Sequence, residues 1–255
     1  MTIIVLIIGF FAGILSGLFG IGGGVVIVPL LIFLAGFSQI EANGASLAGL
    51  LLPVGFFAVI TYHKKHLIDI KASALIALGL IIGSYFGSIL ALDLPATTLK
   101  RAYGIFLLYV SYRFIDPILF FKKSQPHHEH KKVLKPLIKY GAVLITGIVA
   151  GFASGLFGIG GAAIIIPVLV GLLGYEQKEA GGTSLGALLL PVGLPGVIAY
   201  YKSGHINLIL GGMLALGLLV GAFFGAKLAI KLPSKTVKQL YGFLLLIIAL
   251  LFIFR

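Results

Sequence analysis

The chain has no cysteine and no tryptophan, and only seven of its 255 residues are acidic. Without cysteine there is neither a disulfide framework nor a thiolate metal site. Charged residues make up 10 % of the chain, and the apolar segments contain no carboxylate pair and no Ser/His/Asp set. An enzyme within a membrane would need such polar groups in its spans. The sequence therefore favours a protein that is not an enzyme and holds neither a cofactor nor a metal ion.

Apolar residues are abundant instead. Hydrophobic residues form 60 % of the chain, and its mean hydropathy is +1.17. A soluble protein of this size leaves too much surface exposed to hide that many apolar side chains. Apolar runs of about 20 residues, the length of a membrane-spanning helix, recur along the chain. We therefore expect an all-α, polytopic integral membrane protein of the plasma or inner membrane.

The net charge of +12 does not indicate a nucleic-acid partner. The lysines and arginines lie mainly in short turns between apolar runs, where they orient spans and contact anionic lipid head groups. The expected partner of the basic turns is the lipid bilayer.

The chain contains the same unit twice. Gly-Leu-Phe-Gly-Ile-Gly-Gly begins at Gly17 and returns at Gly155, an offset of 138 residues that holds without a gap from Gly9/Gly147 to at least Leu108/Leu246. About half of the paired positions are identical. Two membrane-length units, each interrupted by glycine near its start, are typical of a secondary transporter with its binding site between the repeats.

Apolar runs broken by glycine and proline define the expected helices. In the first repeat they cover residues 3–19, 25–35, 44–62, 72–92 and 102–120, with a polar turn at 38–43. In the second they cover 140–157, 162–173, 182–201, 206–230 and 237–254. We divide the chain into a first transmembrane repeat (1–121), a basic cytoplasmic linker (122–137) and a second transmembrane repeat (138–255). The linker holds His127, His128 and His130, which we interpret as a solvated loop and not as a metal site.

The basic turns predict how the repeats are oriented. The turn at 63–71 carries Lys64, Lys65 and Lys71, whereas its partner at 202–209 carries only Lys202. The next turn reverses this excess. Under the positive-inside rule such a switch indicates two inverted repeats, each of four to five helical segments, with the N-terminus outside. A parallel arrangement with four spans per repeat stays open.

The glycine runs and the polar segments that follow them are the candidate binding site. A helix N-terminus has unpaired N–H groups and about half a positive charge, so at membrane depth a small anion is a natural partner. Two breaks that face each other would supply backbone and side-chain donors. The candidate substrate-binding residues are Gly22, Gly23, Asn43, Ser46, Gly160, Gly161, Thr183 and Ser184.

Each of these assignments has a simpler alternative. Glycines in membrane helices also serve close packing. Glu41 and Glu179 are candidates for proton coupling, but a carboxylate before a helix also stabilises its dipole. Pro53 and Pro191 break spans, either as hinges or as plain kinks. The tyrosines near span ends have membrane-interface anchoring as their default role; they are Tyr62, Tyr103, Tyr200 and Tyr241.

The doubled glycine motif resembles that of a known family. Together with the Glu-Ala-x-Gly-x-Ser segment and the Gly-x-x-x-Gly pairs at Gly83/Gly87 and Gly221/Gly225, it is similar to the TauE/SafE family of sulfite exporters. The resemblance covers nearly the whole chain except the linker. It implies an inner-membrane transporter of small sulfur-containing anions such as sulfite, thiosulfate, sulfoacetate or other organosulfonates.

We therefore expect a secondary transporter, an exporter of small anions that works by alternating access and holds its anion at the glycine-rich helix N-termini. The alternatives are an anion-selective channel and a carrier of small organic carboxylates. A coupling proton or sodium ion and a homodimer are left open.

Overall fold

The computed structural model describes residues 2–19, 23–52, 56–115, 136–229 and 234–254, which are helical or connect helices. The helices of the first repeat are α1 (Thr2–Phe19), α2 (Gly24–Ala35), α3 (Gln39–Gly49), α4 (Phe56–Lys64), α5 (Ile70–Asp93) and α6 (Ala96–Ile115). Those of the second repeat are α8 (Pro136–Phe157), α9 (Ala162–Gly171), α10 (Gln177–Leu188), α11 (Leu194–Lys202), α12 (Leu208–Ala229) and α13 (Ser234–Phe254). The expected all-helical fold is confirmed within these residues.

The helix boundaries follow the sequence repeat. α2 and α9 begin at Gly24 and Ala162, and α6 and α13 begin at Ala96 and Ser234, each pair 138 residues apart. The expected spans 44–62 and 182–201 are each divided into two helices, so the described part of each repeat has six helices, more than the four to five expected.

The predicted polar turn at 38–43 is wrong, because α3 already begins at Gln39. The Ser38 hydroxyl accepts from the backbone N–H of Glu41, and the Glu41 carboxylate accepts from the backbone N–H of Ser38. This capping box satisfies N–H groups that would otherwise be unpaired, and so starts the helix five residues before Gly44.

The most extensive helix–helix packing joins helices from different repeats. α1 packs along α12, and α5 packs along α8. Added methyl groups on Gly217 and Gly221 would overlap the carbonyl oxygens of Leu6 and Phe10 respectively, so α1 and α12 run in the same direction with their backbones in close contact. Glycines four residues apart permit this approach. Gly79 and Gly83 of α5 meet α8 in the same way.

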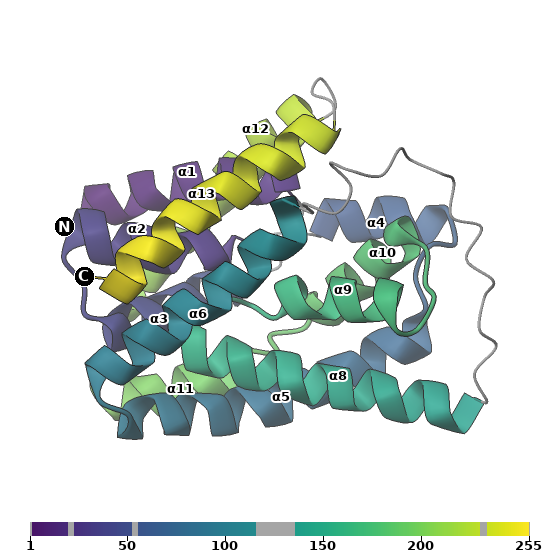
Figure 1. Ribbon diagram of the computed structural model, residues 1–255, viewed down its shortest axis with the longest axis horizontal. Helices are drawn as coiled ribbons and strands as arrows, with labels where there is room; N and C mark the ends of the chain where they lie inside the picture. Colours follow the sequence, from purple (N-terminus) through teal and green to yellow (C-terminus); the bar gives the residue numbers. More distant parts are fainter. Residues whose placement is uncertain (1, 20–22, 53–55, 116–135, 230–233, 255) are drawn as a thin grey trace.

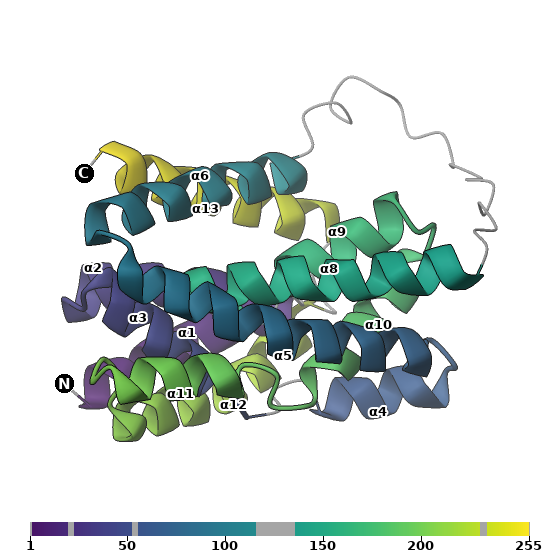
Figure 2. The same cartoon turned by 90° about the horizontal axis from the view of Figure 1, so that it is seen from below.

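The helices form two bundles that mix the repeats. In the first, α12 packs on α1 and α3, and α2 packs on the same two helices; in the second, α5 packs on α8 and α10, and so does α9. In Figure 1 the first bundle lies to the left and the second to the right, and α1 and α8 run in opposite directions. α6 and α13 pack against each other, and their buried residues join the core of the first bundle (Figure 2). They are antiparallel, since Gly104 of α6 lies against Ala249 and Phe252 of α13, whereas Ser111 Oγ, further along α6, donates to the earlier Gly242 carbonyl at 2.8 Å.

Several helices have the length and apolar character of membrane spans. Within the described residues, Ile70–Asp93, Ile138–Phe157 and Leu208–Gly225 are long and apolar enough to cross a bilayer. Large apolar side chains face outward from these helices and from α1, among them Phe11, Phe86, Ile145 and Phe223. Such a surface suits hydrocarbon and not water.

Candidate functional site

Each glycine run is followed at once by a short helix, as the sequence predicts. The N-cap residues of α2 and α9 are Gly23 and Gly161, with φ of 72° and 82°, and as glycines they supply no side-chain cap to either helix. Glycine takes this left-handed conformation without the steric cost of a Cβ. Both helix starts are buried. The structure therefore presents two uncapped helix N-termini inside the protein. Gly22 lies outside the described residues.

The two breaks are in contact with each other. A methyl group added to Gly24, the first residue of α2, would lie 2.7 Å from the carbonyl oxygen of Gly158 and equally close to the backbone of Ile159. Gly23 is buried against the Ser16 side chain. Segments more than 130 residues apart in sequence thus meet where α2 and α9 begin, between the two bundles.

Asn43 and Ser46 donate to the backbone of the second break. Asn43 Nδ2 donates to the Leu156 carbonyl at 2.7 Å, and Ser46 Oγ donates to the Gly158 carbonyl at 2.6 Å. Gln39 Nε2 donates to Asn43 Oδ1 at 2.9 Å, which fixes the orientation of the amide. These predicted anion donors therefore have acceptors within the protein, and they satisfy carbonyls that α8 leaves unpaired at its end.

The N–H of Gly160 also has a partner in the break. It donates to Ser154 Oγ at 3.1 Å, and the N–H of Gly158 donates to the Ser154 carbonyl at 2.7 Å. Gly161 is the next residue and begins α9 without a side-chain cap. Gly161 is the more enclosed of the two predicted glycines in this break, because a Cβ added there would meet Leu80 and Ala150, whereas one added to Gly160 would meet only Leu50.

Thr183 and Ser184 are both buried on α10, but their hydroxyl groups differ. Thr183 Oγ1 accepts from the backbone N–H of Asp69 at 3.0 Å, so it takes part in a contact between α10 and the start of α5. Ser184 is 1 % exposed, and its Oγ has no hydrogen-bond partner within the described residues. A buried polar group without a partner is rare and costs free energy, so Ser184 is the predicted donor that a ligand would satisfy.

The acidic candidates lie away from the breaks. Glu41 is exposed, and the backbone and hydroxyl hydrogen bonds from Ser38 hold its pKa below the ordinary value, with His205 acting in the same direction. Glu179 is partly buried in the first turn of α10. The helix-capping alternative therefore describes Glu41 well. Pro191 lies in the turn between α10 and α11, and Pro53 is outside the described residues.

Two tyrosines at the breaks were missed as site residues. Tyr103 and Tyr200 are fully buried, so the prediction that they anchor the protein at the membrane interface is wrong. The hydroxyl of Tyr103 donates to the Val25 carbonyl in the first turn of α2 at 3.0 Å, and that of Tyr200 donates to the Gly155 carbonyl at 2.8 Å. Their recurrence in both repeats, as Tyr241 and Tyr62, was the only sequence signal for this role.

Within the described residues, no group of three His, Cys, Asp or Glu side chains could hold a metal ion. The linker histidines at 127, 128 and 130 lie outside those residues.

A family model for the sulfite exporter TauE/SafE family matches residues 5–252. The chain belongs to this family. Its relatives include the probable membrane transporter YunE of Bacillus subtilis, 29 % identical over 96 % of this chain and 95 % of the relative. A probable membrane transporter of Methanocaldococcus jannaschii is 30 % identical over 91 % of this chain and 88 % of the relative. No solved structure matches the chain.

Membership of the TauE/SafE family identifies the protein as a membrane transporter, and the apolar helices agree with a multi-pass location in the membrane. The glycine breaks, which carried the resemblance in the sequence, lie where the two bundles meet. In this TauE/SafE protein the family motif therefore coincides with the buried helix N-termini.

Proposed function

We propose that the protein exports small sulfur-containing anions, such as sulfite, thiosulfate or organosulfonates, by alternating access, and that the anion binds at the N-termini of α2 and α9. The supporting observation is that both helices begin uncapped and buried at the contact between the breaks. At membrane depth each unsatisfied N–H group costs on the order of several kcal/mol. An oxyanion would satisfy these groups and would lie at the positive ends of both helix dipoles.

Ser184 offers a further donor that an oxyanion could use. Its hydroxyl is buried without a partner and can donate to an oxygen of the ligand. The equivalent Ser46 donates to the Gly158 carbonyl. One repeat thus has a serine donor that is free and the other a serine donor that is already bonded. In a carrier that alternates between two states, the two serines would exchange these roles.

The contact between the breaks favours a carrier over a channel. Gly24 packs directly on the backbone of Gly158 and Ile159, so an anion passing between the breaks must separate them. A channel holds a continuous path open, whereas a carrier exposes its site to one side at a time. Glu41 and Glu179 remain the candidates for a coupling proton, with Pro53 and Pro191 as hinges.

Anion flux into proteoliposomes tests the proposal. We expect saturable sulfite or sulfoacetate flux with counterflow, and a loss of at least about tenfold in Gly23→Ala, because the added Cβ strains the N-cap and crowds Ser16. The matched control is Gly36→Ala at the other end of α2. Gly36 has the same φ of 72° but open space around its Cβ position, so flux there should stay near the wild-type value.

A thermal-shift screen identifies the substrate class. A ligand that binds only the folded protein stabilises it by about 2.7 kcal/mol at 100 times its dissociation constant. Stabilisation by sulfite and sulfonates but not by acetate supports the proposal. Stabilisation by carboxylates alone would show a carboxylate carrier, and equal flux in Gly23→Ala and Gly36→Ala would show that the anion binds elsewhere.

A further inference from the structure

The two repeats differ at the outer ends of their short helical hairpins. In the second repeat, the loop between α9 and α10 is bound to the start of α5. Asp69 Oδ2 accepts from the Tyr175 hydroxyl at 2.8 Å and from Lys139 Nζ at 3.1 Å. The Lys139 ammonium also lies 4.7 Å from the centre of the Tyr175 ring. We call Asp69, Lys139, Tyr175 and Thr183 the Asp69 network.

The Asp69 network joins four separate segments of the chain. Asp69 caps α5, because its Oδ1 accepts from the N–H of Ala72 at 3.0 Å. Its own N–H donates to Thr183 Oγ1, and Ser73 Oγ donates to the Thr183 carbonyl at 2.8 Å. Charge-assisted hydrogen bonds to the Asp69 carboxylate, which are stronger than neutral ones, thereby join the start of α5 to the start of α8 and to the α9–α10 loop. Neutral hydrogen bonds to Thr183 add α10.

The equivalent place under the 138-residue repeat, where the α2–α3 hairpin meets the start of α12, lacks these polar groups. Phe37 stands where the second repeat has Tyr175, Ala45 where it has Thr183, and Asn207 replaces the charged Asp69. Asn207 still caps its helix, since its Oδ1 accepts from the N–H groups of Ile209 and Leu210 at 3.0 and 3.4 Å. It lacks the carboxylate that would bind a lysine and a tyrosine.

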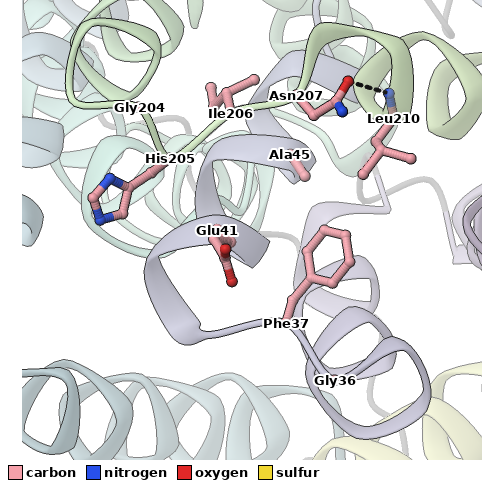
Figure 3. Close-up of a pocket in the computed structure, with 9 residues that line it drawn as sticks. All are labelled: Gly36, Phe37, Glu41, Ala45, Gly204, His205, Ile206, Asn207 and Leu210. Carbon is pink, nitrogen blue, oxygen red and sulfur yellow. Dashed lines mark hydrogen bonds between the residues drawn. The ribbon is translucent and has the colours of Figure 1, made fainter. Parts of the chain in front are cut away.

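A pocket of about 340 Å³ lies at this equivalent place, between the α2–α3 hairpin and the residues that lead into α12. Figure 3 shows Glu41, Ala45 and Phe37 on one side of it and the segment from Gly204 to Asn207 on the other. Its lining residues include Asn207, Phe37 and Ala45, the 138-residue counterparts of Asp69, Tyr175 and Thr183. In Figure 1 the α2–α3 hairpin lies at the left end of the molecule and the α9–α10 hairpin at the right.

We propose that the Asp69 network is a gate that closes one end of the transport path, and that the pocket of Glu41, Phe37 and Asn207 is the water-filled entrance at the opposite end. The proposal rests on the transport function proposed above. The two ends are equivalent under the 138-residue repeat. They differ in that one carries the charged Asp69 network and the other an open pocket, and this difference would let one end be closed while the other is open. Opening the closed end requires the Asp69–Lys139 and Asp69–Tyr175 contacts to break.

The absence of cysteine from the chain permits a direct test. Ala42 and Ala180 are equivalent alanines on α3 and α10, and both are 0 % exposed. Each is changed separately to cysteine, which is then the only thiol, and is labelled with a membrane-impermeant thiol reagent from either side of proteoliposomes. Labelling needs no substrate, so its result is independent of whether sulfite is transported.

Asp69→Asn keeps the size of the side chain but removes the charge that holds Lys139. We expect it to raise the labelling rate at Ala180→Cys by about tenfold or more, since two hydrogen bonds to a charged group are weakened. Labelling at Ala42→Cys should not change. Tyr175→Phe, which introduces the residue found at position 37, should give a smaller increase at Ala180→Cys.

Asp93→Asn at the other end of α5 is the matched control, because Asp93 is exposed and takes no part in the Asp69 network. It should alter neither labelling rate. An unchanged rate at Ala180→Cys in Asp69→Asn would overturn the gate. Equal increases at both cysteines would also overturn it, because they would show general loosening of the fold. A changed labelling pattern without any anion flux would keep the gate and reject the proposed substrate.

Discussion

Ser46 and Ser184 occupy the same position in the two repeats, yet only Ser46 has a hydrogen-bond partner within the described residues. Ser46 Oγ donates to the Gly158 carbonyl at 2.6 Å, whereas Ser184 Oγ is buried without a partner. The same side chain therefore has a structural role in one repeat and is available to a ligand in the other.

Alanine substitution should separate these two roles. Ser46→Ala leaves the buried Gly158 carbonyl unsatisfied and should lower the free energy of unfolding by about 1–3 kcal/mol. Ser184→Ala removes a group that has no partner, so it should leave the melting temperature near the wild-type value but weaken sulfite binding. Thermal melts with and without sulfite measure both effects. Equal loss of stability in the two variants would contradict the assignment.

The Tyr200 hydroxyl should contribute measurably to stability. Tyr200→Phe removes the donor to the buried Gly155 carbonyl and should cost about 1 kcal/mol. The neighbouring Tyr201 is 55 % exposed, so Tyr201→Phe is a matched control with little expected effect. The comparison is made by denaturant or thermal unfolding in detergent. A larger loss in Tyr201→Phe than in Tyr200→Phe would refute the buried capping role.

The contact between α1 and α12 should not tolerate an added methyl group. Gly221→Ala places its Cβ against the Phe10 carbonyl, and overpacking of this kind costs about 1–3 kcal/mol or more. Gly212 lies on the same helix with open space around its Cβ position. Gly212→Ala should be neutral or slightly stabilising, because alanine favours the helix. Thermal stability of the two variants decides the point.

The Asp69–Lys139 pair should give a pH-dependent contribution to stability. Burial acts to raise the pKa of Asp69, but hydrogen bonds from Ala72, Tyr175 and Lys139 outweigh it, so the pKa lies below the ordinary value of an aspartate. The charged and titratable groups in contact with this carboxylate are Lys139 and Tyr175. A lowered carboxylate pKa gives stability that is full above the unfolded pKa and is lost as the pH falls through the folded one.

The melting temperature of wild type should therefore exceed that of Asp69→Asn at pH 5 to 7. The difference should shrink as the pH falls below about 4. Comparison with Asp69→Asn cancels the titration of the other carboxylates. A difference that stays constant down to about pH 2 would show that the charge of Asp69 does not contribute.

The helices were largely predictable because they depend on local sequence. Apolar periodicity and the Gly-Ile-Gly-Gly runs place α2 and α9 to within two residues at each end. The start of α3 was missed although its signal, Ser38 followed three residues later by Glu41, was present in the sequence.

The partners of the polar side chains could not be read from the sequence. Asn43 and Ser46 look like ligand donors because their acceptors, Leu156 and Gly158, lie 113 and 112 residues further along the chain. A chain with 138-residue internal symmetry also suggests equal roles for Asp69 and Asn207. Only the folded structure shows that Lys139 and Tyr175 reach one of them.

α12 of the second repeat packs in the first bundle, and α5 of the first repeat packs in the second bundle. This arrangement has a consequence for biosynthesis. α1 packs along a helix that begins at Leu208, and ribosomes add about 5–20 residues per second, so the first helix waits roughly 10 to 40 seconds for its partner. During that interval its row of glycines faces lipid or the insertion machinery. Each half buries its long helices against the other, so two separately expressed halves should become protease-resistant only when they are made together.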